Sequence, residues 1–462
     1  MSAPYPSWVR VAAPLHAARR ILLTSAVPSR LPRRPATPRC FRLVLVAAVL
    51  GCSGDQQHAI DASRRLAATA KAANPKLPAP PPVAAQSAAA ATPVLHVDAS
   101  ESMRGFVNCL QRPTQFDRVL DRLTVDLGIT SVTSFGAQRS QDRATMDVVP
   151  ASRELHCPAF YKWHQNPDYQ LFDSIAADRG GATHFYLTDG VQSDFVGHNQ
   201  SPSVERLGRW LAQGHALALL AFRGHFEGRG WSETRQAWID GVSTEKRPFY
   251  LFVLAPTEPA LDATLGRLSQ SLRDSALVQR FAPGAATCDV ALTQVSAVTR
   301  DAKIPWVMLT QTATQKAAAA PLAVADYACR IRPEFPLATL RPRLLGLAYW
   351  KWKGTSFDST EAPNGLSVSA RPTTTSAAGA STPLVVSADV GSGTLFGFAH
   401  AVLGAEPGEL RPAVLALSAD ADAERADQDR TYRIGWLVEQ LARAQVERTV
   451  APRSFSFTMS YH

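Results

Sequence analysis

From residue 94 onward, short runs of apolar residues alternate with segments in which apolar residues recur at helical spacing. Val94–Val97 is a strand-like run that ends at Asp98. After a loop, the next apolar residues repeat every three or four positions, with Thr114 as a candidate N-cap and Gly128 as a candidate end: Phe116, Val119, Leu120, Leu123 and Leu127. This pattern predicts a strand followed by an amphipathic helix.

The same alternation continues to about residue 275. Apolar runs predict strands at 129–135, 144–149, 184–187, 215–222 and 249–255, and helical spacing predicts helices at 169–178, 204–211 and 261–268. The runs at 215–222 and 249–255 are almost continuously apolar, as expected for strands covered on both faces. Residues 93–275 therefore predict an α/β domain with a mainly parallel central sheet and helices on both faces.

The remainder of the chain, residues 276–462, shows strand patterns more often than helical ones. Strands are predicted at Trp306–Leu309, Leu384–Ser387 and Thr394–Phe398, a helix over Ile434–Leu441 and a final alternating strand over Phe455–Met459. Trp350 and Trp352 share one face of another alternating segment, which favours core aromatics over a strip that binds glycans or peptides. We expect a β-rich (α+β) accessory domain.

The first 52 residues have the features of an export signal. Arg39 and Arg42 precede the apolar run Leu43–Leu50, which is far shorter than the roughly 20 residues that cross a bilayer. The ending Val49-Leu50-Gly51-Cys52 resembles a bacterial lipobox, which implies cleavage before Cys52 and lipidation of its thiol. By the same resemblance, Ser53 in place of an Asp implies the outer membrane, on either its periplasmic or its surface side.

The composition of the chain predicts a spacer and argues against one class of partner. Residues 53–92 are rich in Ala and Pro, which predicts an extended linker between a lipid anchor and the folded body. Residues 1–52 hold eight Arg and no Lys, Asp or Glu, so the formal net charge of +9 falls to +1 over residues 53–462. The excess of basic residues lies in the leader, and we therefore expect no nucleic-acid partner.

The cysteines predict cross-links in an oxidising compartment. Removal of the leader takes Cys40, and Cys52 carries the lipid, which leaves Cys109, Cys157, Cys288 and Cys329. An even number of Cys in an exported protein predicts two disulfides. We favour the pairs Cys109–Cys157 and Cys288–Cys329 because each stays within one expected domain. The alternatives are the two other pairings and free buried thiols.

Two polar loops follow predicted strands of the α/β domain. Asp98, Ser100 and Ser102 form a D-x-S-x-S motif after the first strand, and Asp189 follows the strand at 184–187. Ligands of such sheets bind beyond the carboxyl ends of the strands. Two carboxylates and two hydroxyls are oxygen donors that suit Mg²⁺ without saturating its six positions, so a partner's Asp or Glu has room to bind.

This pair of motifs resembles the metal-ion-dependent adhesion site (MIDAS) of von Willebrand factor A (VWA) domains, over about residues 93–257. The resemblance implies a Rossmann-like VWA fold and a divalent cation, Mg²⁺ or else Mn²⁺ or Ca²⁺, held by Asp98, Ser100, Ser102 and Asp189. It also implies an envelope protein partner that offers a carboxylate to the metal. The Thr ligand usual in the family is missing from residues 166–171, where Asp168 or Gln170 is the candidate substitute.

Other candidate chemistry is weaker. His156 and His164 are better explained by a loop cross-linked through Cys157 than by metal binding, and Arg223–Trp231 by a Gly-rich connection than by a partner-selecting border of the metal site. No nucleophile-elbow, zinc-protease or P-loop motif occurs, so we predict a binding protein rather than an enzyme. The alternatives are a metal-dependent envelope hydrolase and a metal-free scaffold with a degenerate VWA site.

Overall fold

The computed structural model describes residues 93–138, 143–178, 181–190, 201–232, 235, 237–292, 306–311, 322–352, 357–360, 366–370, 382–387, 395–419 and 429–461. The leader, Cys52 and the Ala/Pro-rich linker lie outside these residues, so export and lipidation stay predictions. Among the described residues, no helix combines the length and the apolar character that a membrane span requires.

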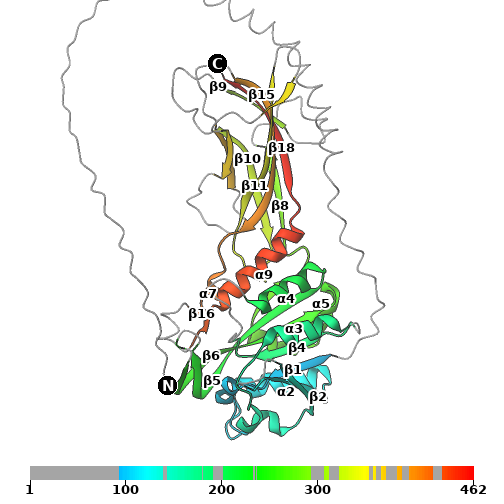
Figure 1. The fold of residues 1–462 in the computed structure, drawn as a ribbon, viewed down its shortest axis with the longest axis vertical. Coiled ribbons are helices and arrows are strands. Elements are labelled where there is room, and N and C mark those ends of the chain that lie inside the picture. The colour runs from blue at the N-terminus through cyan, green and yellow to red at the C-terminus, as the bar shows by residue number, and fades with distance from the viewer. Residues whose placement is uncertain are drawn as a thin grey trace, which may run out of the picture. The chain divides into compact units, whose positions relative to one another are not determined.

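Seven strands form the sheet of the amino-terminal half, in the order β3-β2-β1-β4-β6-β5-β7. Figure 1 labels five of them: β1, β2, β4, β5 and β6. β1 (Val94–Asp98) pairs in parallel with β2 (Ser131–Gly136) and with β4 (His184–Thr188). The other pairs are antiparallel and involve β3 (Thr145–Pro150), β5 (Ala216–Ser232), β6 (Ala237–Ala255) and β7 (Leu277–Phe281). The predicted α/β class is confirmed, but the sheet is mixed, and the prediction that it is mainly parallel is wrong.

Short connections explain two of the antiparallel pairs, β2–β3 and β5–β6. A parallel pair needs a crossover of a dozen or more residues, usually a helix. Only residues 137–144 separate β2 from β3, and β5 pairs with β6 as one long hairpin through Arg223–Trp231, the segment that we expected to be a Gly-rich connection. β7 pairs with β5, so this sheet extends one strand past the boundary expected at residue 275.

Helices cover both faces of the sheet, as predicted. α2 (Gln115–Leu127) and α5 (Glu258–Arg267) share an apolar cluster with Leu95 and Val97, and α3 (Asp168–Ala177) and α4 (Pro202–Ala212) share another with Tyr186 and Phe252. Thr114 and Asp117 cap the start of α2 reciprocally, and Gly128 ends it in the left-handed region with φ 67°. Both predicted ends of this helix are confirmed. A shorter helix, α6 (Gln270–Asp274), precedes β7.

Three short 3-10 helices lie in the connections around β1 and β3. η1 (Glu101–Phe106) follows β1, and η2 (Arg153–His156) and η3 (Pro158–Phe160) follow β3. The disulfide Cys109–Cys157 joins these two connections. The second disulfide, Cys288–Cys329, joins residues that face each other on β8 and β10. Both favoured cysteine pairings are therefore confirmed.

The described residues of the carboxyl-terminal half form mainly β-strands, together with one long helix, α9 (Ile434–Thr449). One sheet has the order β13-β14-β10-β8, with strands Ser367–Ala370, Thr382–Ser387, Leu322–Ile331 and Ala286–Leu292. Another has the order β12-β11-β15-β18-β9, with strands Phe357–Thr360, Leu340–Trp352, Leu395–Pro407, Arg453–Tyr461 and Trp306–Gln311. β16 (Ser418–Ala419) pairs with β17 (Thr431–Tyr432), and α7 (Pro412–Leu415) is one turn long.

Helix α9 contacts α4, and one apolar cluster contains residues from both halves of the chain. The predicted strand that carries Trp350 and Trp352 is part of β11. Which way those two indoles point lies outside the described residues.

Candidate metal site at the ends of strands β1 and β4

The D-x-S-x-S motif folds into a tight turn at the carboxyl end of β1. Asp98 is the last residue of the strand and is fully buried. Its Oδ1 accepts a hydrogen bond of 2.9 Å from the backbone N–H of Ser100, which fixes the carboxylate against the turn. The hydroxyls of Ser100 and Ser102 lie 3.0 Å apart, and both side chains are buried. One turn thus gathers a carboxylate and two hydroxyls.

Asp189 comes from the neighbouring strand. Because β4 runs parallel to β1, the carboxyl ends of both strands lie at the same edge of the sheet. Thr188, the last residue of β4, donates its hydroxyl to Asp98 Oδ2 at 2.9 Å and accepts the N–H of Gly190 at 3.1 Å. Asp189 lies between these two residues, is 2% exposed, and interacts electrostatically with Asp98. The structure therefore brings together the four residues that the motifs predicted.

The loop before α3 supplies a different residue from the one expected. Asn166 Nδ2 donates to Asp98 Oδ2 at 2.6 Å and to the hydroxyl of Tyr186 at 2.7 Å. The Tyr186 hydroxyl in turn donates to Asp168 Oδ1. Among the described residues, Tyr186 and Asn166 thus link Asp168 to Asp98, and Gln170 Oε1 accepts the N–H of Ala144 at 2.9 Å. Asn166, and neither of the expected residues Asp168 and Gln170, is therefore the described residue of this loop that contacts Asp98.

The backbone of this loop is held against the motif. Glu101 N–H donates to the carbonyl of Trp163 at 2.8 Å, and Trp163 N–H donates to the carbonyl of Ala99 at 3.1 Å. A Cβ at Gly136 would meet the Trp163 side chain at 2.5 Å, so the glycine leaves room for this side chain next to the end of β2. These backbone contacts hold the loop in place, and the side chain of Asp98 accepts hydrogen bonds from three segments of the chain, through Ser100, Asn166 and Thr188.

The electrostatics of the cluster are unusual for two carboxylates. Burial, and after it the charge of Asp189, raise the pKa of Asp98 to about 7, even though hydrogen bonds from Ser100 and Thr188 act in the opposite direction. No Lys or Arg of the described residues pairs with Asp98. Buried negative charge of this kind is costly unless a cation or a proton compensates it.

The donor set fits a hard divalent cation. In the part of the chain that the structure describes, no three side chains of His, Cys, Asp or Glu form a metal-binding cluster. The candidate site instead combines the carboxylates of Asp98 and Asp189 with the hydroxyls of Ser100 and Ser102. All-oxygen sets with few charged ligands suit Mg²⁺, Mn²⁺ or Ca²⁺ better than zinc.

The β5–β6 hairpin lies against the segment that carries the motif. Phe226 on β5 meets Phe106 of η1 edge to face, with 4.9 Å between ring centroids, and a Cβ at Gly105 would lie 2.5 Å from the Phe226 ring. Arg247 on β6 lies over the same ring at 4.8 Å. The segment Arg223–Trp231 therefore borders the turn that follows Ser102, and it does so as a strand.

The two histidines considered as metal ligands have other partners. His156 Nδ1 lies 2.7 Å from Asp117 Oδ1 and its Nε2 lies 3.1 Å from Asp121 Oδ1. His164 lies 3.4 Å from a carboxylate oxygen of Glu101 and is about half exposed. His156 stabilises the start of α2 beside the Cys109–Cys157 disulfide, which agrees with the structural interpretation of that loop.

Thr188 and Asn166 are the residues of the cluster that sequence reasoning missed. The sequence could have indicated Thr188, because its hydroxyl comes directly before Asp189 at the end of a strand and so lies at the same edge of the sheet. No sequence pattern indicated Asn166, because its contact with Asp98 depends on how the loop before α3 folds back. Comparison with protein-family models, with curated proteins and with solved structures finds no match for this chain. The function of the site therefore has to be inferred from its geometry and its motifs.

Proposed function

We propose that this protein binds a protein partner through a divalent cation held at the ends of β1 and β4. The observation that carries the proposal is the buried carboxylate pair of Asp98 and Asp189: burial, and after it the charge of Asp189, raise the pKa of Asp98 to about 7, and no Lys or Arg of the described residues pairs with Asp98. A cation removes the repulsion between these carboxylates. The resemblance of the motifs to the MIDAS of VWA domains supports the same function.

The chain's own residues would divide the task of holding the cation. Asp98 and Asp189 supply negative charge, and Ser100 and Ser102 supply neutral hydroxyl oxygens. Thr188 and Asn166 hold the carboxylate of Asp98 in place through hydrogen bonds of 2.9 and 2.6 Å. When bound, the cation supplies an electrophilic centre for a carboxylate of the partner. Because few of the donors are charged, much of the cation's charge remains available to that carboxylate.

We propose that the protein acts in the bacterial envelope, anchored to the outer membrane through a lipid on Cys52. The apolar run before Cys52 and the Ala/Pro-rich linker after it support this location. The two disulfides give independent support, because such bonds persist in oxidising compartments.

A cross-linked pull-down from envelopes, with and without EDTA, tests the function. We expect wild-type protein to retain a partner in Mg²⁺ and to lose it in EDTA, and we expect Asp98→Ala to lose it in both. Glu447→Ala, which removes an exposed carboxylate of α9 outside both proposed sites, serves as the control and should behave as wild type. Capture that resists EDTA, or that survives Asp98→Ala in folded protein, would contradict the proposal.

A further inference from the structure

The outer edge of β3 is open to strand addition. In the part of the chain that the structure describes, β3 is the last strand of its sheet and pairs only with β2, in a register without a shift. Ala151 N–H donates to the carbonyl of Thr130 just beyond this pair of strands. Because hydrogen-bonding residues alternate along an antiparallel pair, Asp147 and Val149 turn their backbone groups toward β2, and Met146 and Val148 turn theirs outward.

This edge has one charged side chain, Asp147, and one proline, but no bulge, and neither residue removes the outward N–H groups of Met146 and Val148. Charged side chains, bulges and prolines normally discourage pairing with another chain. Here Pro150 stands only at the end of the strand, where its missing N–H would face outward. Val148 is 73% exposed, which is high for an apolar residue. The outward groups of Met146 and Val148 are thus available to another extended segment.

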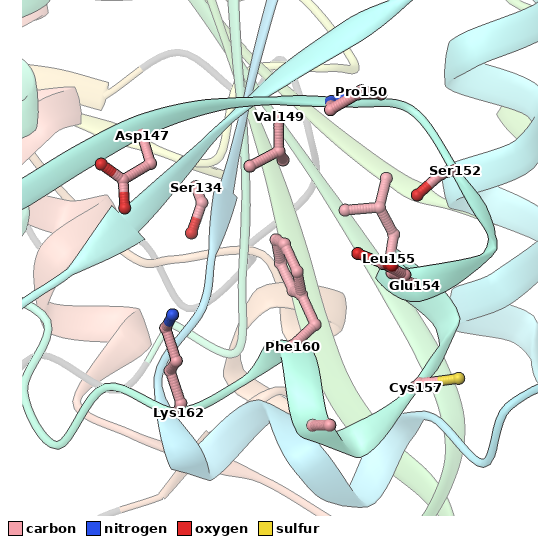
Figure 2. Close-up of a pocket in the computed structure, with 11 residues that line it drawn as sticks. Ser134, Asp147, Val149, Pro150, Ser152, Glu154, Leu155, Cys157, Phe160 and Lys162 are labelled. Atoms are coloured by element: carbon pink, nitrogen blue, oxygen red, sulfur yellow. The ribbon is translucent and has the colours of Figure 1, made fainter.

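A cavity of about 440 Å³ lies beside the same strand (Figure 2). Asp147 and Val149, which share one face of β3, line it together with Leu155 and Phe160 from the connection after β3. Figure 2 shows the Phe160 ring, Val149 and Leu155 pointing into the middle of the cavity, with Asp147 toward one end and Glu154 toward the other. The cavity therefore has an apolar centre and acidic ends.

Two acidic residues and one basic residue line the cavity. Asp147 and Glu154 are exposed, and no ion pair involves either of them among the described residues. The cation that lines the cavity is Lys162, whose Nζ lies 5.2 Å from the centre of the Trp163 ring. An occupant with a basic group beside an apolar one complements this arrangement.

We propose that β3 binds an extended peptide segment of a partner protein by strand addition, with a bulky apolar side chain in the cavity and a basic side chain beside Asp147. Side chains two positions apart on an added strand point to the same face, as Val149 and Asp147 do on β3. The cross-strand neighbour of Val149 is then the apolar residue, and that of Asp147 the basic one. Backbone bonds to Met146 and Val148 give affinity, and the cavity gives selectivity.

This proposal does not depend on the metal site. A small molecule would fill the cavity without satisfying the outward backbone groups of β3, whereas an extended peptide does both. The residues that bind the peptide come from β3 and the connection after it, and none of them contributes to the cluster around Asp98.

Fluorescein-labelled heptapeptides provide the test. The set places Phe or Leu at the centre of a Thr-rich background and Arg or Lys two positions before or after it; controls replace the apolar residue by Ser or the basic residue by Glu. We expect at least one apolar–basic peptide to bind the full-length protein about tenfold more tightly than either of its controls, by fluorescence anisotropy.

Two substitutions at one position separate backbone pairing from side-chain contact. Val148→Pro removes the outward N–H and should weaken peptide binding about tenfold, and Val148→Thr, which keeps the N–H, should change it less than about twofold. Asp98→Ala should leave peptide binding unchanged, so that failure here and failure of the metal proposal are distinguishable. Circular dichroism and thermal unfolding establish that each variant is folded.

Hydrogen exchange on the wild-type protein gives a readout that needs no variant. Peptide addition should protect the amides of Met146 and Val148 and leave the exchange of β7, at the other edge of the sheet, unchanged. The proposal is overturned if no peptide of the set exceeds its controls at millimolar concentration, if folded Val148→Pro binds as wild type, or if the amides of Met146 and Val148 gain no protection.

Discussion

The centre and the edge of one sheet place similar side chains in opposite environments. At the centre, Asp98 ends and Ser100 follows a strand with parallel neighbours on both sides, and both residues are almost fully buried. At the edge, Asp147 lies opposite Ser134 on a strand with one neighbour, and its carboxylate is exposed. The same residue type therefore has different chemistry: at the centre, burial makes negative charge costly unless a cation or a proton compensates it, and at the edge the carboxylate stays exposed to solvent.

The largest expected effect comes from removing one carboxylate in each place. Asp98→Ala removes a ligand and half of the buried charge, and it should weaken Mg²⁺ or Mn²⁺ binding by about 100-fold or more. Asp147→Ala should change metal affinity less than about twofold, because an exposed carboxylate is hydrated and screened. Isothermal titration of both variants gives the comparison.

Two results would contradict this difference between the centre and the edge of the sheet. If folded wild-type protein takes up no metal at millimolar concentration, the centre of the sheet holds a degenerate site. If both variants lose metal to the same extent, the ion lies elsewhere, and burial is not what selects its position.

The pH dependence of metal binding is the next largest effect. The pKa of Asp98 is raised from the ordinary carboxyl value of 3.8 to about 7 in the metal-free protein. Below that pH a proton occupies the carboxylate and must leave when metal binds, so the apparent affinity should fall about tenfold for each pH unit below 7 and level off above it. In the metal-free protein the same shift should lower stability as pH rises from the ordinary value toward 7, because the unfolded state loses the proton first.

Titration calorimetry in buffers of different ionisation enthalpy measures this proton release directly. Asp147→Ala should show the pH profile of wild type. A metal affinity that does not change between about pH 5 and 7 would show that Asp98 is not a ligand, whatever its charge in the metal-free state.

The backbone next to Asp189 offers a smaller and purely structural test. Gly190 has φ 72°, and a Cβ there would lie 2.6 Å from the ring of Tyr250, so Gly190→Ala should destabilise the protein by about 2–5 kcal/mol. Gly128 has φ 67° but nothing within 4 Å of an added Cβ, so Gly128→Ala should cost only about 1–2 kcal/mol of backbone strain. Urea unfolding of the two variants compares them; equal losses would mean that Tyr250 moves aside.

Much of the first half of this fold could be predicted because its signals are local. The ends of α2 followed from a capping residue and a glycine, and the four residues of the candidate site followed from their positions after strands. The antiparallel course of β5 and β6 could not be predicted from apolar runs, since a run of buried residues carries no direction. Asn166 escaped because its contact with Asp98 links positions 68 residues apart through a loop whose path depends on tertiary packing.

The smallest expected effect concerns the edge of the domain. Hydrogen bonding to Asp117, helped by Asp121, raises the pKa of His156 against the opposing effect of its burial. A raised histidine pKa adds stability that is fully present below the ordinary pKa of histidine and is lost as pH rises through the folded value. The difference in unfolding free energy between wild type and His156→Gln should therefore shrink as pH rises, as measured by urea unfolding across the neutral range. His164→Gln, which alters an exposed imidazole beside Glu101, controls for the general loss of a histidine. A difference that grows with pH would mean that His156 is bound as the neutral ring, and that the contact with Asp117 does not depend on charge.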